Sequence, residues 1–362
     1  MPDISLSRPP AWNVLAARWR DLEARADGSF FTSWNWVGSR AASRFPHPVL
    51  LQAHTGGRLV GLGLFNRRAR LPLPARLWLN ESGDPALDTI YVEHNGLLME
   101  RGQEGAVLPR AIGHLAAGPG HVVLGGVDDA HLAAAQASGA LVHRRAHPAA
   151  SPWIDLDEVR GHPGGHLGLL SANTRQQLRR SLRRYGEAGP LQVRRAASLV
   201  EAHAFLEALG RLHQHTWTRR GKPGAFANHG FVAFHADLLA AAWPRGEADL
   251  LCIAAGAQPI GYLYNFSWRG RVGNYQSGFD YDVASPHLKP GLTCHHLAVE
   301  LYAREGAGAY DFLAGEHRYK ASLATRTAAL HWVEIMPPAS LPGLLHRTRA
   351  AFARRGRTPG EG

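Results

Sequence analysis

Apolar residues recur at helical spacing in several segments of this chain. Trp12, Leu15, Trp19 and Leu22 lie three or four residues apart, a pattern that predicts an amphipathic helix over 11–26. We expect further helices over 105–117, 176–185, 198–218 and 230–242, and one that opens at Pro290-Gly291.

Short apolar runs bounded by glycine turns predict strands. We expect them over 49–54, 59–65, 76–80 and 121–124, and as a meander over 249–254, 258–268 and 271–279. Gly56-Gly-Arg-Leu-Val-Gly61 and Gly256-Ala-Gln-Pro-Ile-Gly261 each place a glycine turn before an apolar strand. The pattern indicates an α/β (α+β) chain of two related domains in tandem, each a mixed, mostly antiparallel sheet flanked by helices.

Turn-rich and basic segments divide the chain. The stretch from Pro152 to Gly165, with Gly161-His-Pro-Gly-Gly165 at its end, indicates a linker. The predicted domains are therefore 1–155 and 156–336. A basic C-terminal helix or tail follows over 337–362, either solvated or lying on a membrane or an acidic partner.

Composition indicates a folded protein and bears on its compartment. Of 362 residues, 45% are hydrophobic, yet no stretch approaches the ~20 apolar residues that span a bilayer. The N-terminus lacks an uninterrupted apolar region, and Cys252 and Cys294 fit reduced thiols better than a disulfide. We expect a cytoplasmic protein, or one peripheral at the inner membrane.

The formal charge of +11 has two interpretations. It indicates an acidic partner such as a nucleotide, tRNA or an anionic glycan, or it reflects the arginine bias of a GC-rich genome. The helix over 176–185, which Asn173 or Thr174 is placed to cap, carries much of this charge. It could follow tRNA or a polysaccharide, or it could be a solvated helix that packs on Leu178 and Leu182.

The segment 273–320 carries most of the candidate chemistry. A strand that ends in Gly278-Phe-Asp280, a helix that opens at Pro290-Gly291 and a strand followed by Tyr319-Lys320 form one βαβ unit. The free N–H groups and the dipole of a helix N-terminus favour an anion there. A diphosphate-bearing acyl donor fits this turn.

Several elements between Asn173 and Lys320 carry a family resemblance through their order and spacing. They are Gln176 to Tyr185 with Gly189 after it, Leu212-His213 followed by Trp217, Gln276-Ser-Gly-Phe-Asp280, Pro290-Gly291, and Tyr310-Asp-Phe-Leu-Ala-Gly315 to Tyr319-Lys320. Together they resemble the GNAT-fold acyltransferases of the CelD-like (cellulose biosynthesis) family, relatives of the FemAB aminoacyl transferases. In that family the N-terminal block is a second, degenerate GNAT-like domain.

The resemblance implies roles for several residues. Lys320 would stabilise the oxyanion of a tetrahedral intermediate, Asp280 would accept the proton of an amine, and Tyr275 would protonate the leaving thiolate. The alternatives are a surface ion pair for Lys320, an Asx turn for Asp280 and core packing for Tyr275.

The donor diphosphate would bind at Lys289, Pro290 and Gly291. Of the usual Gln/Arg-x-x-Gly-x-Gly/Ala pattern only Gly291 remains, and Pro290 removes one amide N–H donor. Lys289 could supply a compensating charge. Glu316, His317, Arg318, Tyr319, His213 and Trp217 are candidates for binding the acceptor, although 316–318 could be a solvated loop. Asp311 is expected to pair with Arg318 or Lys320.

The motifs do not favour metal chemistry, because the sequence contains neither His-Glu-x-x-His nor Cys-x-x-Cys. The leading hypothesis is an N-acyltransferase that moves an acyl group from acyl-CoA to an amine on a sugar, an amino acid, a peptide or an envelope or exopolysaccharide precursor. Two alternatives stay open: a FemAB-type ligase that uses aminoacyl-tRNA, and a non-catalytic GNAT module in a polysaccharide assembly complex.

Overall fold

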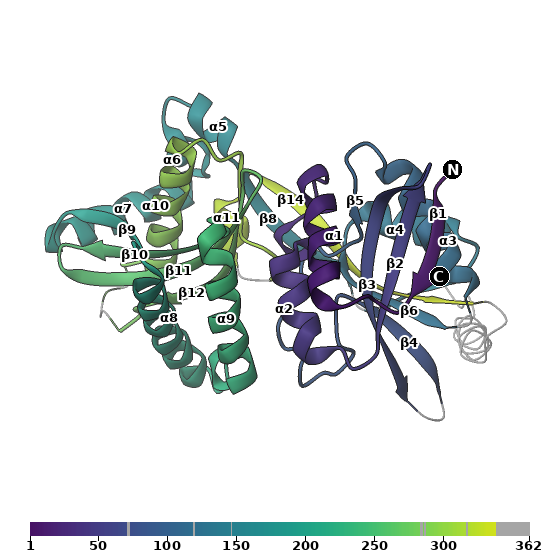
Figure 1. The fold of residues 1–362 in the computed structure, drawn as a ribbon. Helices are drawn as coiled ribbons and strands as arrows, with labels where there is room; N and C mark the ends of the chain where they lie inside the picture. Colours follow the sequence, from purple (N-terminus) through teal and green to yellow (C-terminus); the bar gives the residue numbers. More distant parts are fainter. Residues whose placement is uncertain are drawn as a thin grey trace, which may run out of the picture. The chain divides into compact units, whose positions relative to one another are not determined.

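The computed structural model describes residues 1–337 except 71, 72, 119, 146, 283, 284, 286, 316 and 317 (Figure 1). Its contacts divide the chain into two units, Met1–Pro148 with Leu330–Gly362, and Ala149–Ala329. The second unit is thus inserted into the first. The boundaries 1–155, 156–336 and 337–362 stay a prediction, and residues 338–362, with the proposed basic helix, lie outside the described part.

The first unit is a sheet covered by helices. Its strands are ordered β1-β2-β3-β4-β6-β14, with β5 beside β3 and β7 beside β14. All of these pairs are antiparallel except β4 with β6, which is parallel. The elements are β1 (Asp3–Ser7), α1 (Trp12–Arg25), α2 (Trp34–Arg44), β2 (Pro48–Thr55), β3 (Arg58–Arg70), β4 (Leu73–Leu79), β5 (Leu98–Met99), α3 (Glu104–Ala117), β6 (His121–Val127), α4 (Asp129–Ala137), β7 (Leu141–Arg144) and β14 (Arg326–Met336).

The second unit repeats this plan. Its strands are ordered β8-β13-β12-β11-β10-β9, and only β12 and β13 are parallel among these pairs of described strands. The elements are β8 (Ala149–Asp155), α5 (Leu156–Gly161), α6 (Gly165–Leu169), α7 (Ala172–Ala188), β9 (Leu191–Arg195), α8 (Leu199–Arg219), α9 (His229–Ala242), β10 (Ala248–Ala255), β11 (Gln258–Trp268), β12 (Arg271–Phe279), α10 (Pro290–Arg304), β13 (Ala309–Asp311) and α11 (Arg318–Leu323).

Helices α8 and α10 cover opposite faces of the second sheet. Neighbouring residues of a strand point to opposite faces. A Cβ on Gly261 of β11 would lie 3.2 Å from Sγ of Cys294 in α10, whereas the next residue, Tyr262, packs on Phe205 of α8. The strand pattern therefore buries both faces of β11.

The two glycine turns of the sequence open equivalent hairpins. Thr55 pairs with Arg58 in β2–β3, and Ala255 pairs with Gln258 in β10–β11. Both hairpins contain a register shift two residues before the turn, at 53/54 and at 253/254. The faint repeat in the sequence thus corresponds to a repeated supersecondary structure.

Some predicted local features were wrong. The expected linker from Pro152 to Gly165 instead contains the end of β8 and all of α5, because Asp155 caps a short helix. Helix α7 is capped by Ser171, whose Oγ accepts the N–H of Thr174, and not by Asn173 or Thr174. No helix in the described part is long and apolar enough to cross a membrane.

Candidate functional site

The ends of β12 and β13 and the start of α10 meet in the second unit. Strands β12 and β13 pair only from Arg271↔Ala309 to Gly273↔Asp311, and β12 then continues to Phe279. Beyond these pairs, the buried ring of His295 packs on Phe279, Phe312 and Tyr319. We call the residues around this point the strand-end site: Phe279, Asp280, Tyr281, Gly291, His295, Phe312, Leu313, Ala314, Tyr319 and Lys320.

The N-terminus of α10 is held by α7. The N–H of Lys289 donates to Oγ of Ser181 at 2.9 Å, and this oxygen lies 2.8 Å from Oγ1 of Thr293. Pro290 is the first helical residue, so the next amides, those of Gly291 and Leu292, belong to the first turn, where helix geometry supplies no partner. The N–H groups of Gly291 and Leu292 therefore have no acceptor within α10 itself.

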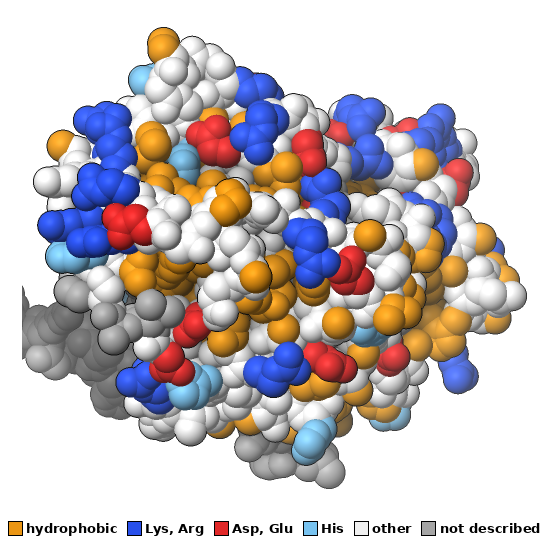
Figure 2. Space-filling model, turned by 90° about the vertical axis from the view of Figure 1, so that its left-hand side faces the viewer, with side chains coloured by type: hydrophobic (Ala, Val, Ile, Leu, Met, Phe, Trp, Pro, Cys, Tyr) orange, Lys and Arg blue, Asp and Glu red, His pale blue; other side chains and the backbone are white. Residues whose placement is uncertain are grey.

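Positive side chains surround this turn. Arg180, Arg184 and Lys289 lower the pKa of His287, with Arg180 the largest cause, so these groups lie close together. Arg179, Arg180, Arg183 and Arg184 are exposed on α7. Figure 2, which faces this side of the second unit, shows Lys and Arg side chains gathered along one edge. Their charge adds to that of the helix dipole and favours an anion.

Lys320 lies in the strand-end site. It is only 9% exposed, and its Nζ donates to the carbonyl oxygen of Ala314 at 2.8 Å and to that of Leu313 at 3.3 Å. Burial, with the charge of Lys320 as the next cause, lowers the pKa of His295 to about 3. The ammonium is thus buried, held by two backbone carbonyls and close to a neutral, buried imidazole.

Asp280 forms the Asx turn that was the alternative to a catalytic role. Its Oδ1 accepts the N–H of Asp282 at 3.0 Å, and its own N–H donates to the carbonyl of Ile260. Oδ2 takes no part in this turn. Burial raises the pKa of Tyr185, and Asp280 adds to this shift, so the two side chains are neighbours.

Tyr275 is the extra residue of a β-bulge. Tyr264 pairs with Gln276, and Asn265 pairs with Asn274, which leaves Tyr275 between them. Its ring packs on His235 of α9 at 4.8 Å and on Phe266 at 5.1 Å. The core packing weighed as an alternative for Tyr275 is therefore present.

Two tyrosines that sequence reasoning did not assign as acids stand at the strand-end site. The hydroxyl of Tyr281 lies 3.5 Å from the position that a Cβ on Gly291 would take. Tyr319 stacks on His295 with ring centres 5.3 Å apart. The Tyr281-Asp282 step directly after the strand was the signal that could have identified the first.

The predicted acceptor residues are dispersed. His213 is buried between Trp217 and Phe226, and burial lowers its pKa to about 4, so it is a neutral packing residue. The end of α8 that carries Trp217 is tied to the loop after β12, because Arg219 bonds Asp282. Glu316 and His317 lie outside the described residues, as does the side chain of Arg318.

Lysine usage supplies a signal that the sequence analysis missed. The chain contains three lysines among 40 basic residues, Lys222, Lys289 and Lys320. Lys222 follows α8 and lies over the Trp217 ring, Lys289 precedes α10, and Lys320 lies on α11. The ammonium of lysine is a compact charge, and the larger, planar guanidinium of arginine does not replace it in a confined site. The few lysines of an arginine-rich chain are therefore candidates for functional residues.

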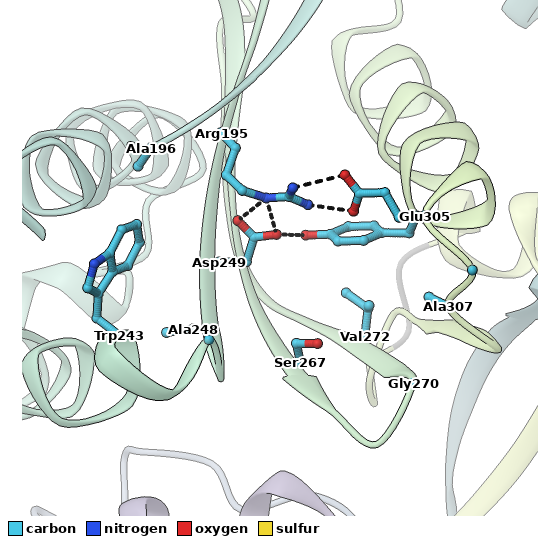
Figure 3. A pocket seen from close by; sticks show the side chains of 13 residues that line it. Arg195, Ala196, Trp243, Ala248, Asp249, Ser267, Gly270, Val272, Glu305 and Ala307 are labelled. Carbon is cyan, nitrogen blue, oxygen red and sulfur yellow. Dashed lines mark hydrogen bonds and ion pairs between the residues drawn. The ribbon is translucent and has the colours of Figure 1, made fainter. Parts of the chain in front are cut away.

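A separate pocket of about 490 Å³ lies at the opposite end of α10 (Figure 3). There Arg195 bonds Glu305 through both Nη atoms and Asp249 through Nε, and the Tyr302 hydroxyl donates to Asp249 at 2.7 Å. Helix α10 is 15 residues long, so its two ends are ~20 Å apart. None of the predicted site residues lines this pocket.

Metal ligands do not gather in the described part of the chain. No group of three or more His, Cys, Asp or Glu side chains there could hold an ion.

Residues 172–321 match the family model described as an acetyltransferase (GNAT) domain. No curated protein matches the sequence. Among solved structures, FemX is similar with a TM-score of 0.59 at 10% identity, covering 91% of this chain and 96% of FemX. L-PGS from Bacillus licheniformis is similar with a TM-score of 0.56 at 11% identity, covering 91% of this chain and 94% of that one.

The C-terminal domain (DUF2156) of a putative lysylphosphatidylglycerol synthetase from Agrobacterium fabrum is also similar, with a TM-score of 0.56 at 9% identity over 93% of this chain and 96% of that one. Identities this low show a shared fold and not a shared activity. The resemblance to GNAT-fold acyltransferases is confirmed for residues 172–321, and the predicted mixed α/β fold is confirmed over the whole chain.

Proposed function

We propose that this chain, whose residues 172–321 match the GNAT domain, is an N-acyltransferase that uses an acyl-CoA thioester and a primary amine. The observation that carries the proposal is the pairing, within one βαβ unit, of a helix N-terminus beside basic side chains with a buried ammonium at Lys320. The first can hold a diphosphate, and the second can stabilise a developing oxyanion.

The proposed donor site uses the turn before α10. The amides of Gly291 and Leu292 would bind the diphosphate, Pro290 would fix the start of the helix, and Lys289, Arg180 and Arg184 would neutralise its charge. The glycine pattern of the family is incomplete at this turn. The positive side chains of α7 would attract the diphosphate where backbone amides of the missing glycines would otherwise bind it.

The reaction would proceed by direct transfer. The amine nitrogen attacks the thioester carbonyl carbon while Oδ2 of Asp280 accepts the amine proton, directly or through water. The Lys320 ammonium stabilises the oxyanion, and its collapse breaks the carbon–sulfur bond. The thiolate then takes a proton from a tyrosine. Tyr275 is the candidate from the family pattern, and Tyr281 is a second candidate because its hydroxyl lies near Gly291.

The acceptor would bind where α8 and α11 approach the loop after β12. Trp217 and Tyr319 would give the acceptor an aromatic contact surface, and His213 would support Trp217 by packing on it. The polar groups of the acceptor would form hydrogen bonds with Arg318, Glu316 and His317. An envelope or exopolysaccharide precursor, a sugar, a peptide or an amino acid would satisfy this set. The buried, unpaired Cys252 and Cys294 are compatible with a reducing compartment such as the cytoplasm.

The second candidate is an aminoacyl-tRNA-dependent ligase. The observation that favours it is the row of exposed arginines on α7, at 179, 180, 183 and 184, beside the proposed donor turn. A third possibility, a non-catalytic module, rests on the incomplete donor pattern.

A thermal-shift screen separates these candidates. For the acyltransferase we expect acyl-CoA thioesters to raise the melting temperature saturably, and Lys289→Gln to weaken the shift. Mass spectrometry of amine mixtures then identifies the acylated acceptor, and Lys320→Ala should lower turnover 100-fold or more. A shift with tRNA alone, steeply dependent on salt and lost when Arg179, Arg180 and Arg183 become Gln, would favour the ligase. No shift with either donor would favour the module.

A further inference from the structure

Leu313 adopts a backbone conformation that leucine rarely takes. Its φ is +59°, and the other non-glycine residues with positive φ in the described part are Asn80, His94 and Arg269. Leu313 is the one bulky apolar side chain among these four described residues, and it lies two residues after the end of β13, in the connection to α11. Such strain persists only where surrounding contacts enforce it.

The contact that enforces it comes from Asp311. The carboxylate is fully buried, and its Oδ1 accepts the N–H of Leu313 at 2.8 Å. The same oxygen accepts the hydroxyl of Ser151 at 3.0 Å, and Oδ2 accepts two N–H groups of Arg271, at 2.7 and 3.1 Å. Strands β8 and β12 thus fix the carboxylate, and the carboxylate fixes the turn.

The turn directs two carbonyls at one ammonium. With Leu313 left-handed, the carbonyl oxygens of Leu313 and Ala314 both accept from Nζ of Lys320, across seven and six residues of sequence. An ordinary extended backbone at Leu313 would carry these two oxygens in different directions. The strained residue is therefore what allows consecutive carbonyls to hold the same side chain.

We propose that Asp311 and the left-handed turn at Leu313 are positioning residues that hold the Lys320 ammonium at the strand-end site. The inference rests on the proposed function for the purpose of that ammonium. Asp311 was expected to pair with Arg318 or Lys320, and this pairing stays a prediction because the side chain of Arg318 lies outside the described part. The structure shows Asp311 bonded to Arg271 and Ser151, and its bond to the N–H of Leu313 connects it to Lys320 through the backbone.

A purely structural role is the competing explanation. The ion pair of Asp311 with Arg271 joins β13 to β12, and this alone would stabilise the sheet. It requires neither the bond to the N–H of Leu313 nor the positive φ. The experiment must therefore measure how accessible the Lys320 ammonium is, in addition to the stability of the second unit.

The chain is suited to such a measurement because it contains only Lys222, Lys289 and Lys320. Modification by isotope-labelled acetic anhydride at pH 8, followed by peptide mass spectrometry, gives a separate rate for each lysine. In the unsubstituted protein we expect Lys320 to react at least ten times more slowly than the exposed Lys222. Lys222 and Lys289 then serve as internal references in every variant.

Four variants separate the explanations. Asp311→Ala removes the acceptor of the Leu313 N–H, and Leu313→Val introduces a β-branched residue that resists positive φ. Both should raise the Lys320 rate at least fivefold relative to Lys222. The controls are Ser151→Ala, which removes another bond to the same oxygen, and Leu313→Asn, which tolerates positive φ. Both should leave the ratio within twofold.

An unchanged Lys320 rate in folded Asp311→Ala or Leu313→Val would overturn the proposal. If Asp311→Ala fails to fold, the Val and Asn variants at Leu313 decide, because both shorten the leucine side chain and only Asn tolerates the positive φ. Turnover with acetyl-CoA, if found, should show kcat reduced in Leu313→Val with KM unchanged, and recovery in Leu313→Asn. If no donor is turned over but the labelling pattern holds, the positioning stands and the proposed function fails.

Discussion

Arg195 is the charged residue with the most partners in the second unit's pocket. It joins Asp249, which is buried, to Glu305, and the Tyr302 hydroxyl completes the network (Figure 3). Replacing Arg195 with Gln leaves the Asp249 carboxylate buried without a counter-charge. We expect a loss of about 2–3 kcal/mol of unfolding free energy, below the full cost of a buried pair because the arginine side chain is 39% exposed.

Urea unfolding measures this effect, and Arg184→Gln is the matched control. Arg184 pairs with Glu187 on the exposed side of α7, both side chains being about half exposed. Its loss should change stability by less than ~0.5 kcal/mol. Equal effects of the two substitutions would show that the pocket network is no stronger than a surface pair.

At the scale of residues, the sequence singles out candidates, but their partners come only from the structure. Lys320 could be chosen because Tyr319-Lys320 follows a strand and a glycine loop. The contact of Asp311 with Arg271 could not, because it joins residues 40 apart across a parallel pair of strands. The positive φ of Leu313 likewise has no sequence signal, since leucine does not favour it.

Helix α10 buries two consecutive histidines, and this gives the second unit a pH dependence. His295 faces Tyr310 and Tyr319, His296 stacks on His166, and burial lowers the pKa of both consecutive histidines to about 3. In the unfolded chain a histidine titrates near 6.5. Between about pH 6.5 and 3 the unfolded state binds more protons, so stability falls as the pH is lowered.

For each of these histidines, we expect the free energy of unfolding to fall by about 2 kcal/mol when the pH is lowered from 7 to 5, because only the unfolded state binds the proton. His296→Gln, which cannot be charged, should reduce the pH slope by about one proton, whereas the exposed His229→Gln should leave it unchanged. Urea unfolding at half-unit steps of pH gives the slope. If His296→Gln shows the same slope as the unsubstituted protein, then burial does not keep His296 neutral in the folded state.

The contact of α8 with β12 depends on a glycine. A Cβ on Gly278 would lie 2.3 Å from the carbonyl oxygen of Leu209 and 2.9 Å from its Cα, so alanine would force the helix backbone away from the strand. We expect Gly278→Ala to cost about 3 kcal/mol or more, measured by urea unfolding. Because α8 also carries Trp217, acceptor binding should weaken in parallel.

Gly113→Ala is the control for this substitution. Gly113 lies within α3 of the first unit, and a Cβ there meets no atom within 4 Å. Alanine is the better helix former by about 0.5–1 kcal/mol, so this variant should be neutral or more stable. A Gly278→Ala protein as stable as the Gly113→Ala protein would contradict the close approach of α8.

At the scale of elements, the periodic segments were the predictable ones. The stripe of Leu15, Trp19 and Leu22 predicted α1, and the glycine turns predicted β2–β3 and β10–β11. Helix α5 was missed because Gly161 and Pro163 signal a turn, while the six-residue helix before them is too short to show a period. β14 was missed because its partners, β6 and β7, are about 200 residues away.

The path of the whole chain follows from β14. The chain builds most of the first unit by Pro148, forms the second unit, and returns to the first at Leu330. The sequence predicted two domains in tandem but not this insertion, since nothing local marks a strand as belonging to a distant sheet. A family model that covers residues 172–321 is consistent with a second unit that is continuous in sequence.

The insertion predicts different behaviour for two fragments. Residues 149–329 contain every element from β8 to α11 and a core of their own, so this fragment should fold and unfold cooperatively. Residues 1–148 lack β14, whose Val333 and Ile335 are fully buried in the core of the first unit and whose Glu334 bonds Arg76. That fragment exposes the hydrogen-bonding edge of β6 and the core that Val333 and Ile335 fill, and it should not give a cooperative transition.

Circular dichroism melting curves and NMR dispersion of both fragments test this expectation. The decisive control joins 1–148 to 330–362 through a short Gly-Ser linker, which restores the part of β14 that pairs with β6 and β7 and should restore cooperative unfolding. Cooperative folding of 1–148 alone would show that β14 is dispensable for the first unit. Failure of the linked fragment, with 149–329 folded, would show instead that the first unit folds only when the second is present in the same chain.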